Sequence, residues 1–316
     1  MNGLITRQTY RETGRLRRTW HDMRKMHWFY FMLIPGIVYY IIFAYIPMWG
    51  TLFAFMDYSP FLGIFGSPWV GLKHFEKLFG GRYFGMLLRN TVTLSILDLL
   101  FYFPAPILLA LLLNELRSNR FKRIVQSVTY LPHFMSAVIV VSIFRNLLSS
   151  ETGVVNYILN TLGFDTITFL TDPSWFRPIY IVQSIWKEVG WGTIIFMAAL
   201  CNIDMALYEA AVVDGANRWQ QFRNITLPSI MPTVIILLIL RIGTFLNTGY
   251  ETVLLMQNSM NHDVSEVFDT YVYRIGITNG QYSFSTAVGL FKSVVAFILV
   301  YSTNLFAKKQ GYDGLF

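Results

Sequence analysis

The chain has 316 residues, of which 54% are hydrophobic and only 14% are charged, against roughly 25% charged residues in a typical soluble domain. This composition excludes a soluble globular protein and predicts an all-α integral membrane protein. The net charge of +7 is interpreted as a signal of membrane topology. Nucleic-acid binding is disfavoured, because the basic residues flank apolar segments and form no single basic face.

The chain begins with a basic tail over residues 1–27, for which a helix at the membrane interface and a disordered segment are equally good predictions. Six apolar segments follow, each close to the ~20 residues that a membrane-spanning helix requires. The first of them carries Pro35 and Pro47, which predict a tilt or a kink near Pro47. The predicted spans are 28–56, 90–114, 124–147, 178–200, 232–256 and 285–306.

The distribution of Lys and Arg predicts the orientation. Most of the 25 basic residues lie in the two tails and in the segments 115–123 and 201–231. Because cytoplasmic segments retain basic residues, both termini and the 201–231 loop are predicted to be cytoplasmic. No cleavable signal peptide is expected, since the first apolar run is too long. The predicted organisation is a cytoplasmic tail over 1–27, a six-helix transmembrane domain over 28–307 with a cytoplasmic loop at 203–231, and a cytoplasmic tail over 308–316.

Residues that commonly carry catalysis or bind metals are dispersed along the chain. Cys201 is the single cysteine, so it forms neither an intrachain disulfide nor a cysteine metal cluster. The five His residues show no ligand spacing. Asp57, Asp98 and Glu115 are isolated in the sequence and form no paired catalytic motif. The chain also lacks the phosphate-binding sequence G-x-x-x-x-G-K-[ST]. We therefore predict no catalytic residues, no metal site and no cofactor bound by this chain.

The most informative segment is polar, lies between two apolar spans and covers residues 209–228, EAAVVDGANRWQQFRNITLP. Residues 209–213 favour a short helix, and Gly215 suits a sharp reversal because glycine takes a positive φ at little steric cost. A second short helix is predicted over 217–224, and Pro228 is predicted to start the next span. Two short helices joined by a glycine corner form a candidate docking element for a soluble partner. The alternative is an amphipathic linker whose aromatic residues lie in the headgroup layer.

The ordered pattern of EAA, then Gly, then I-x-LP resembles the EAA motif of a family of membrane permeases. That motif is the cytoplasmic coupling loop of carbohydrate permeases in binding-protein-dependent ATP-binding-cassette (ABC) importers. The run that starts at Leu131-Pro132 resembles the third span of sugar permeases. FDTYVYRIGITNGQYSFSTAVGLFKSVV resembles the start of the sixth span in an oligosaccharide subgroup that includes alginate importers. The resemblance assigns ATPase coupling to Glu209, Ala210, Ala211, Asp214, Gly215, Ala216, Trp219, Phe222, Ile225, Leu227 and Pro228.

This resemblance implies the six-helix fold of a type I importer permease in a bacterial cytoplasmic (inner) membrane, surrounded by lipid. It also implies a second permease of a different sequence, two ATPase subunits that bind ATP and Mg, and an extracytoplasmic binding protein that delivers an oligosaccharide. Glu209 would contact the ATPase near its nucleotide-sensing loop, and Gly215 would let the loop fit the ATPase groove. The identity of the sugar stays open.

Polar side chains inside the predicted spans are candidates for a substrate pathway, because charges at membrane depth usually line a cavity or form pairs. Lys187 and Glu188 are adjacent in sequence and need not pair with each other. Arg145 and Arg241 are predicted to pair with carboxylates from other spans. The predicted pathway residues are Gln183, Trp186, Lys187 and Trp191 in the fourth span and Asn247, Tyr250 and Glu251 in the fifth. For any one of them, an interhelix hydrogen bond is the alternative.

Two other functions within membrane transport stay open at this point. One is an importer permease for a different solute class, such as amino acids or metal ions. The other is an autonomous channel or secondary carrier, which would leave the glycine-cornered loop unexplained. A membrane-embedded enzyme is disfavoured because no paired carboxylates stand near a membrane face.

Overall fold

The computed structural model describes residues 26–312, 314 and 315, so the predicted interfacial helix in the basic tail lies outside the described residues. The described backbone is helical, apart from loops and one isolated β-bridge between Met56 and Trp69. Short π and 3₁₀ segments extend or join several α-helices. The α-helices are α2 (His27–Tyr40), α3 (Ile46–Met48), α4 (Gly63–Gly66), α5 (Lys73–Phe79), α6 (Phe84–Leu97), α7 (Pro104–Glu115), α8 (Asn119–Tyr130), α9 (Ala137–Leu148), α10 (Val154–Thr161), α11 (Pro173–Cys201), α12 (Met205–Val213), α13 (Arg218–Gln221), α14 (Leu227–Gly243), α15 (Tyr250–Met256), α16 (His262–Ser265), α17 (Phe268–Val272) and α18 (Tyr282–Lys309).

The chain divides into two compact units, residues 1–53 and 54–316. The first predicted span is confirmed as a helix that runs from His27 to Phe55. A π turn over Ile41–Tyr45 precedes Pro47, which occupies the first turn of α3. Proline has no backbone N–H to donate, and the π turn is where the hydrogen-bond register of this helix changes.

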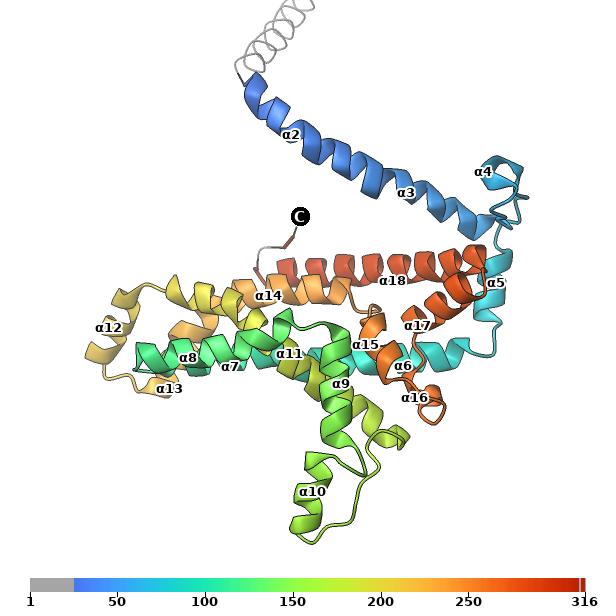
Figure 1. The fold of residues 1–316 in the computed structure, drawn as a ribbon. Coiled ribbons are helices and arrows are strands. Elements are labelled where there is room, and N and C mark those ends of the chain that lie inside the picture. The colour runs from blue at the N-terminus through green and yellow to red at the C-terminus, as the bar shows by residue number, and fades with distance from the viewer. Residues whose placement is uncertain (1–25, 313, 316) are drawn as a thin grey trace, which may run out of the picture. The chain divides into compact units, whose positions relative to one another are not determined.

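The second unit is a helix bundle in which α11 contacts α7, α8 and α14, and α14 contacts α18. Figure 1 shows α7, α11, α14 and α18 running along one another, with α12 and α13 at one end and α5 and α17 at the other. The contact of α11 with α8 is close at Gly190, where a Cβ atom would lie 2.1 Å from the carbonyl oxygen of Thr129. A larger side chain at this position would force the two helices apart.

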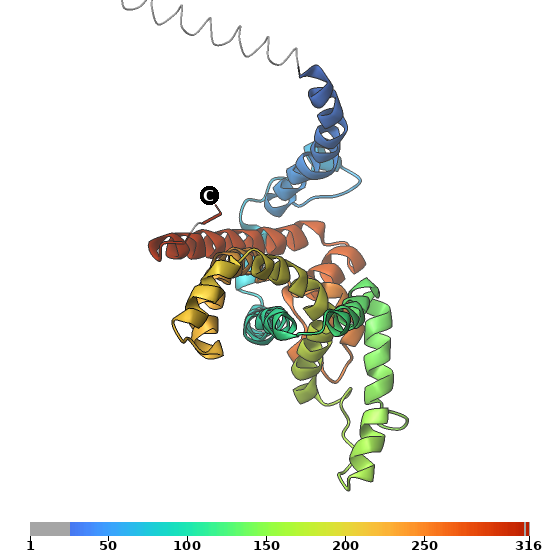
Figure 2. The same ribbon diagram turned by 90° about the vertical axis from the view of Figure 1, so that its left-hand side faces the viewer.

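Four helices are long and apolar enough to cross a membrane, or up to six if each of two bent helix pairs is one span. The predicted span over 124–147 falls on one of these bent pairs. Helix 119–134 and α9 meet at an angle of 106°, and Figure 2 shows α9 and α10 leaving the bundle. The break has a local cause, because Met135 is extended and the Ser136 hydroxyl accepts from the Ile139 N–H to begin α9.

The predicted span over 232–256 is wrong in its bounds. Pro228 lies in the first turn of α14, as predicted, but a π segment joins α14 to α13 without a break, so one continuous helix runs from Arg218 to Gly243. Residues 244–249 leave the helix, and Gly249 takes a φ of 63° before α15 begins. The last predicted span, 285–306, is confirmed within α18.

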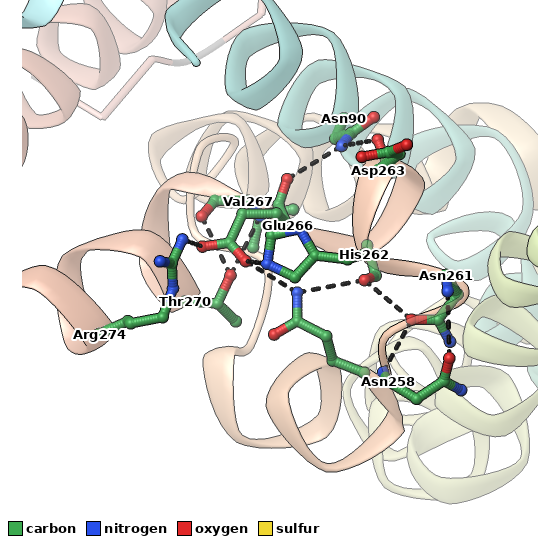
Figure 3. Close-up of polar contacts among 11 residues, drawn as sticks. Asn90, Asn258, Asn261, His262, Asp263, Glu266, Val267, Thr270 and Arg274 are labelled. Carbon is green, nitrogen blue, oxygen red and sulfur yellow. Dashed lines mark hydrogen bonds and ion pairs between the residues drawn. The ribbon is translucent and has the colours of Figure 1, made fainter. Parts of the chain in front are cut away.

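A polar network fixes the segment between α15 and α18 (Figure 3). The buried Glu266 carboxylate accepts hydrogen bonds from Arg274 at 2.8 Å and Gln257 at 2.9 Å, and it lies 2.6 Å from His262 Nε2. Asn90 on α6 donates to the carbonyl oxygen of Glu266 at 3.0 Å. The carboxylate thus joins side chains from both ends of this irregular segment, and Asn90 connects the segment to α6, so the network holds it against the bundle.

Candidate functional site

The corner between α12 and α13 is a defined helix-capping motif. Gly215 has a φ of 78°, a left-handed conformation that glycine adopts at low cost. The Ala216 N–H donates to the Ala211 carbonyl at 2.8 Å, and the Gly215 N–H donates to the Val212 carbonyl at 3.1 Å. These two bonds form a Schellman motif, which closes the C-terminus of α12. The predicted glycine corner is therefore confirmed.

Further hydrogen bonds make the corner rigid. The Asn217 side chain and the Gln220 side chain bond each other's backbone N–H groups in a capping box, at 2.9 and 2.7 Å. The Gln221 amide donates to the Ala216 carbonyl at 3.0 Å. The hydroxyls of Tyr208 and Thr226 lie 2.8 Å apart and link α12 to the π segment that leads into α14. A force applied at α12 would therefore reach α14 through fixed contacts.

The surface of this corner is unusually apolar for a polar loop. Val213 is 87% exposed and Trp219 is 66% exposed. Beneath α12, a cavity of about 890 Å³ is lined by Glu209 and by Glu115 and Arg218, which form an ion pair at 3.8 Å. Of the other residues predicted to couple, Ala210, Asp214 and Pro228 are exposed, whereas Ala211, Ala216, Phe222, Ile225 and Leu227 are half-buried. Exposed apolar side chains next to charged groups are typical of a protein-docking surface.

A second candidate site is a polar cavity of about 450 Å³ within the bundle. Its walls come from the end of α6 and the π turn after it, from the middle of α11, from α14, from the irregular segment 244–249 and from the start of α15. Hydroxyl, amide and charged groups line it together with apolar side chains. The polar lining residues are Ser95, Asp98, Tyr102, Tyr180, Gln183, Ser184, Lys187, Glu188, Arg241, Thr244, Asn247, Thr248 and Thr252.

Two buried atoms of this cavity have unused hydrogen-bonding capacity. The Gln183 side chain is 2% exposed, and its Oε1 has no hydrogen-bond partner among the described residues. The same holds for Oγ1 of the buried Thr248, although Tyr180 donates its hydroxyl to the Thr248 carbonyl at 2.7 Å. An unpaired buried polar atom costs free energy, so both positions favour a polar ligand or water.

The charged residues of the cavity form pairs. Arg241 Nε donates to Asp98 Oδ2 at 2.6 Å, and this guanidinium lies over the Tyr102 ring. Lys187 Nζ is 3.4 Å from the Glu188 carboxylate, which is 2.6 Å from His133 Nδ1. The prediction that Arg241 pairs with a carboxylate of another span is confirmed.

The corresponding prediction for Arg145 is wrong. Arg145 donates to the backbone carbonyl of Leu255, and no carboxylate lies within ion-pair distance of it among the residues that the structure describes. The irregular chain around α15 exposes carbonyl groups that a regular helix would engage, and a guanidinium satisfies them equally well.

The structure separates the predicted pathway residues into two sets. Gln183, Lys187 and Asn247 line the polar cavity. The other four residues lie elsewhere: Trp186 packs edge-on against Phe144, Trp191 stacks on His133, Tyr250 stacks on Tyr273, and Glu251 is exposed. Trp191 and Tyr250 thus act in aromatic contacts within this chain.

Several cavity residues were absent from the predicted pathway. Asp98, Glu188 and Arg241 are charged residues at membrane depth, which was a usable signal. Tyr102, Thr244 and Thr248 carried no comparable signal, because their place depends on the π turn after α6 and on the end of α14 at Gly243. No three His, Cys, Asp or Glu side chains converge as metal ligands in the described part of the chain.

A further cavity of about 390 Å³ adjoins the first one through a shared residue. It lies between α9, the start of α11 and residues 256–261, and Gln183 lines both cavities. The lining of this second cavity is mainly apolar and aromatic, with Phe144, Phe169 and Phe176 as its aromatic residues. Gln183 therefore stands at the junction of a polar chamber and a more apolar one.

Comparison with known proteins shows the family to which the chain belongs. The family described as "Binding-protein-dependent transport system inner membrane component" matches residues 102–311. Protein LplB of Bacillus subtilis (strain 168) is 55% identical over 294 residues, which cover 93% of this chain and 92% of that protein. The polygalacturonan/rhamnogalacturonan transport system permease protein YteP of the same organism is 52% identical over 287 residues, which cover 91% and 89%.

Solved structures agree with this placement. A chain of a bacterial alginate ABC transporter, in complex with an alginate pentasaccharide-bound periplasmic protein, superposes with a TM-score of 0.87. It is 43% identical and covers 94% of this chain and 100% of its own length. The present chain therefore belongs to the family of inner-membrane components of binding-protein-dependent transport systems, and it is a permease subunit of an ABC importer, not an enzyme.

Proposed function

We propose that this chain forms half of the translocation pathway for an oligosaccharide that an extracytoplasmic binding protein delivers. The second half comes from another permease of different sequence. The observation that carries this proposal is the polar cavity with the unpartnered Gln183 and Thr248 side chains. Hydroxyl-rich ligands satisfy such groups, and the cavity volume of about 450 Å³ accommodates part of a sugar chain at a time.

Energy for transport comes from two ATPase subunits that bind ATP and Mg and dock on the α12–α13 corner. The exposed Val213 and Trp219 side chains support this role, as does the rigid link from α12 to α14. This assignment places the corner and both termini in the cytoplasm, in agreement with the distribution of basic residues. ATP binding then favours one orientation of the cavity, and the sugar biases it only through its different affinity for the two states.

An acidic oligosaccharide is the substrate class that we favour. The relatives support it, because YteP is described as a polygalacturonan/rhamnogalacturonan permease and the solved relative imports the acidic polysaccharide alginate. Lys187 supports it as well. Its ammonium group lies 3.4 Å from Glu188, whose carboxylate also contacts His133, so Lys187 retains donors for a sugar carboxylate.

The function is tested with the complete importer, purified from its native membrane and reconstituted into liposomes. We expect ATP-dependent uptake of labelled oligouronides of two to five units, in preference to neutral maltopentaose. Uptake of the neutral sugar alone would contradict the acidic substrate class. No uptake of any sugar, from a preparation whose ATPase responds to an amino acid or another solute, would contradict the oligosaccharide function.

The cavity assignment predicts different effects for three substitutions. Gln183→Leu removes hydrogen bonds to the sugar and should raise the KM for uptake about 5- to 30-fold, since each lost bond costs about 1–2 kcal/mol. Ser184→Ala is the matched control in the same cavity wall, because the Ser184 hydroxyl already donates to the Tyr180 carbonyl. Tyr250→Ala should also leave the KM unchanged. Equal KM values for Gln183→Leu and Ser184→Ala would contradict the assignment.

A further inference from the structure

The loop between the first span and α5 has an unusual composition. Residues 59–72, SPFLGIFGSPWVGL, contain no charged side chain. Phe61 and Phe65 are 99% and 104% exposed, whereas Trp69, which is 62% exposed, stacks on Phe55 at the base of the loop. A soluble loop of this length normally carries polar or charged side chains, so the Phe61 and Phe65 rings require an apolar environment that the described residues of the second unit do not supply.

Several backbone groups of this loop are hydrogen-bonded within the chain, and the N–H groups of Val70 and Gly71 donate to the Phe55 carbonyl. The Ser67 hydroxyl accepts from the Ser59 N–H at 3.0 Å and donates to the Gly63 carbonyl at 2.7 Å. The N–H groups of Leu62 and Gly63 both donate to the Ser59 carbonyl. Pro60 and Pro68 have no N–H to satisfy. Internal bonding of this kind is a requirement for a segment that enters lipid, where water is not available to backbone groups.

The base of the loop is polar and is fixed to the last span. The Tyr58 N–H donates to the Ser283 hydroxyl at 2.8 Å, in the first turn of α18. Lys73 pairs with Asp57 at 2.6 Å, and this hydrogen bond lowers the pKa of the Asp57 carboxyl. The loop thus joins the ends of two membrane spans, with charged groups at its base and aromatic rings at its tip. In Figure 1, α4 lies beyond the end of α18 that α5 contacts.

We propose that residues 59–72 form a membrane-inserted loop, with Phe61 and Phe65 in the interfacial region of the leaflet opposite the α12–α13 corner. Only the identity of that leaflet, the outer one, rests on the proposed function. Lipid explains the complete lack of charge, the aromatic tip and the internally bonded backbone together, because aromatic rings concentrate at the membrane interface. The occupant is therefore a lipid surface.

A protein partner fits this loop less well. A delivery protein that binds and leaves uses a surface about as polar as an ordinary protein surface, with a charged rim. The tip of the loop has no such rim, because residues 59–72 contain no charged side chain. The membrane anchor would keep the outer end of α18 at a fixed depth while the cavity changes orientation.

The test measures the environment of the tip directly in the complete importer, reconstituted into nanodiscs. Phe65→Cys is introduced into a Cys201→Ser background and labelled with a bimane fluorophore. Glu76→Cys on α5 is the matched control, because Glu76 is exposed and belongs to the same loop region. Quenching is then compared for lipids that carry a nitroxide near the headgroup and for iodide in the water.

Lipid nitroxide is expected to quench the label at position 65 about threefold more than the label at 76, and iodide the reverse. Iodide quenching that is equal at the two positions would overturn the proposal. Protection from iodide without nitroxide quenching would also overturn it, because a protein subunit would then cover the tip. If the Phe65→Cys complex fails to assemble, Phe61→Cys serves in its place, because Phe61 is 99% exposed. ATPase stimulation by solutes in the same nanodiscs reports on the proposed function separately.

Discussion

Gly215→Trp is expected to reduce ATP-driven uptake by at least about tenfold, while the complex still reaches the membrane and still hydrolyses ATP. A steric clash in the centre of a docking surface costs roughly 2 kcal/mol or more, which corresponds to such a factor. Within this chain, a Cβ atom at position 215 meets no atom within 4 Å. A methyl group at position 215 therefore meets no steric obstacle within this chain.

The effect of backbone strain at position 215 has to be measured separately from the effect of side-chain size. The φ of 78° at Gly215 makes any other L-residue costly, by roughly 1–2 kcal/mol. Gly215→Ala carries this strain with almost no bulk, and Gly215→Asn reduces the strain because asparagine tolerates the left-handed region. We expect both variants to transport within about threefold of the unmodified protein, since a loss of this size leaves a protein of ordinary stability folded. Uptake and ATPase activity are measured on the same proteoliposomes.

Two outcomes would count against docking at the corner. Unchanged uptake by the Gly215→Trp variant would show that no subunit approaches position 215. Equal losses in the Ala and Trp variants would attribute the effect to strain in this chain alone.

The coupling corner was predictable because its determinants are local. The reversal needs a residue that takes a positive φ, and Gly215 is the single glycine between Glu209 and Pro228. Asn217 and Gln220 stand three residues apart and form the capping box. The continuation of this helix into α14 was missed, because a π turn at Phe222–Thr226 carries the chain past Pro228 without a break. A π turn has no clear signature in a sequence.

The breaks inside two predicted spans were harder to predict from the sequence than the coupling corner. Hydropathy identifies apolar segments but does not detect a change of direction, so the 106° bend before α9 was hidden within one apolar run. Pro132 and the capping residue Ser136 were the available local signals. In the fifth span, Gly249 marked the break, yet the apolar residues of α15 extended the predicted helix beyond it.

The cavity depends on contacts far apart in the sequence. Asp98 and Arg241 are 143 residues apart, and the sequence indicated only that Arg241 needs a carboxylate. The choice of Asp98 follows from the packing of α11 and α14 around the π turn that begins at Asp98. Gln183 was predicted from its place among polar groups, whereas its unpartnered Oε1 is visible only in the structure.

Arg241→Met is expected to destabilise the subunit strongly. Among the described residues, Arg241 is the sole ion-pair partner of Asp98, whose side chain is only 13% exposed. Removing one member of a buried pair costs roughly 3–5 kcal/mol, and we expect about 3 kcal/mol here because the Arg241 side chain is partly exposed. The measurement is the apparent Tm of the detergent-solubilised complex, together with its amount in the membrane.

The double variant Asp98→Asn/Arg241→Gln distinguishes a structural role of the ion pair from a role in transport. It removes both charges and keeps two groups that can hydrogen-bond each other, so most of the lost Tm should return if the pair is structural. Uptake should then recover along with the Tm, because the sugar would still meet Gln183 and Lys187. A double variant that is as stable as the unmodified protein but transports nothing would assign Asp98 and Arg241 to the transport step itself. Retention of full stability by the single Arg241→Met variant would instead contradict a buried, mutually dependent pair, since an unpaired carboxylate at membrane depth cannot be neutral in its effect.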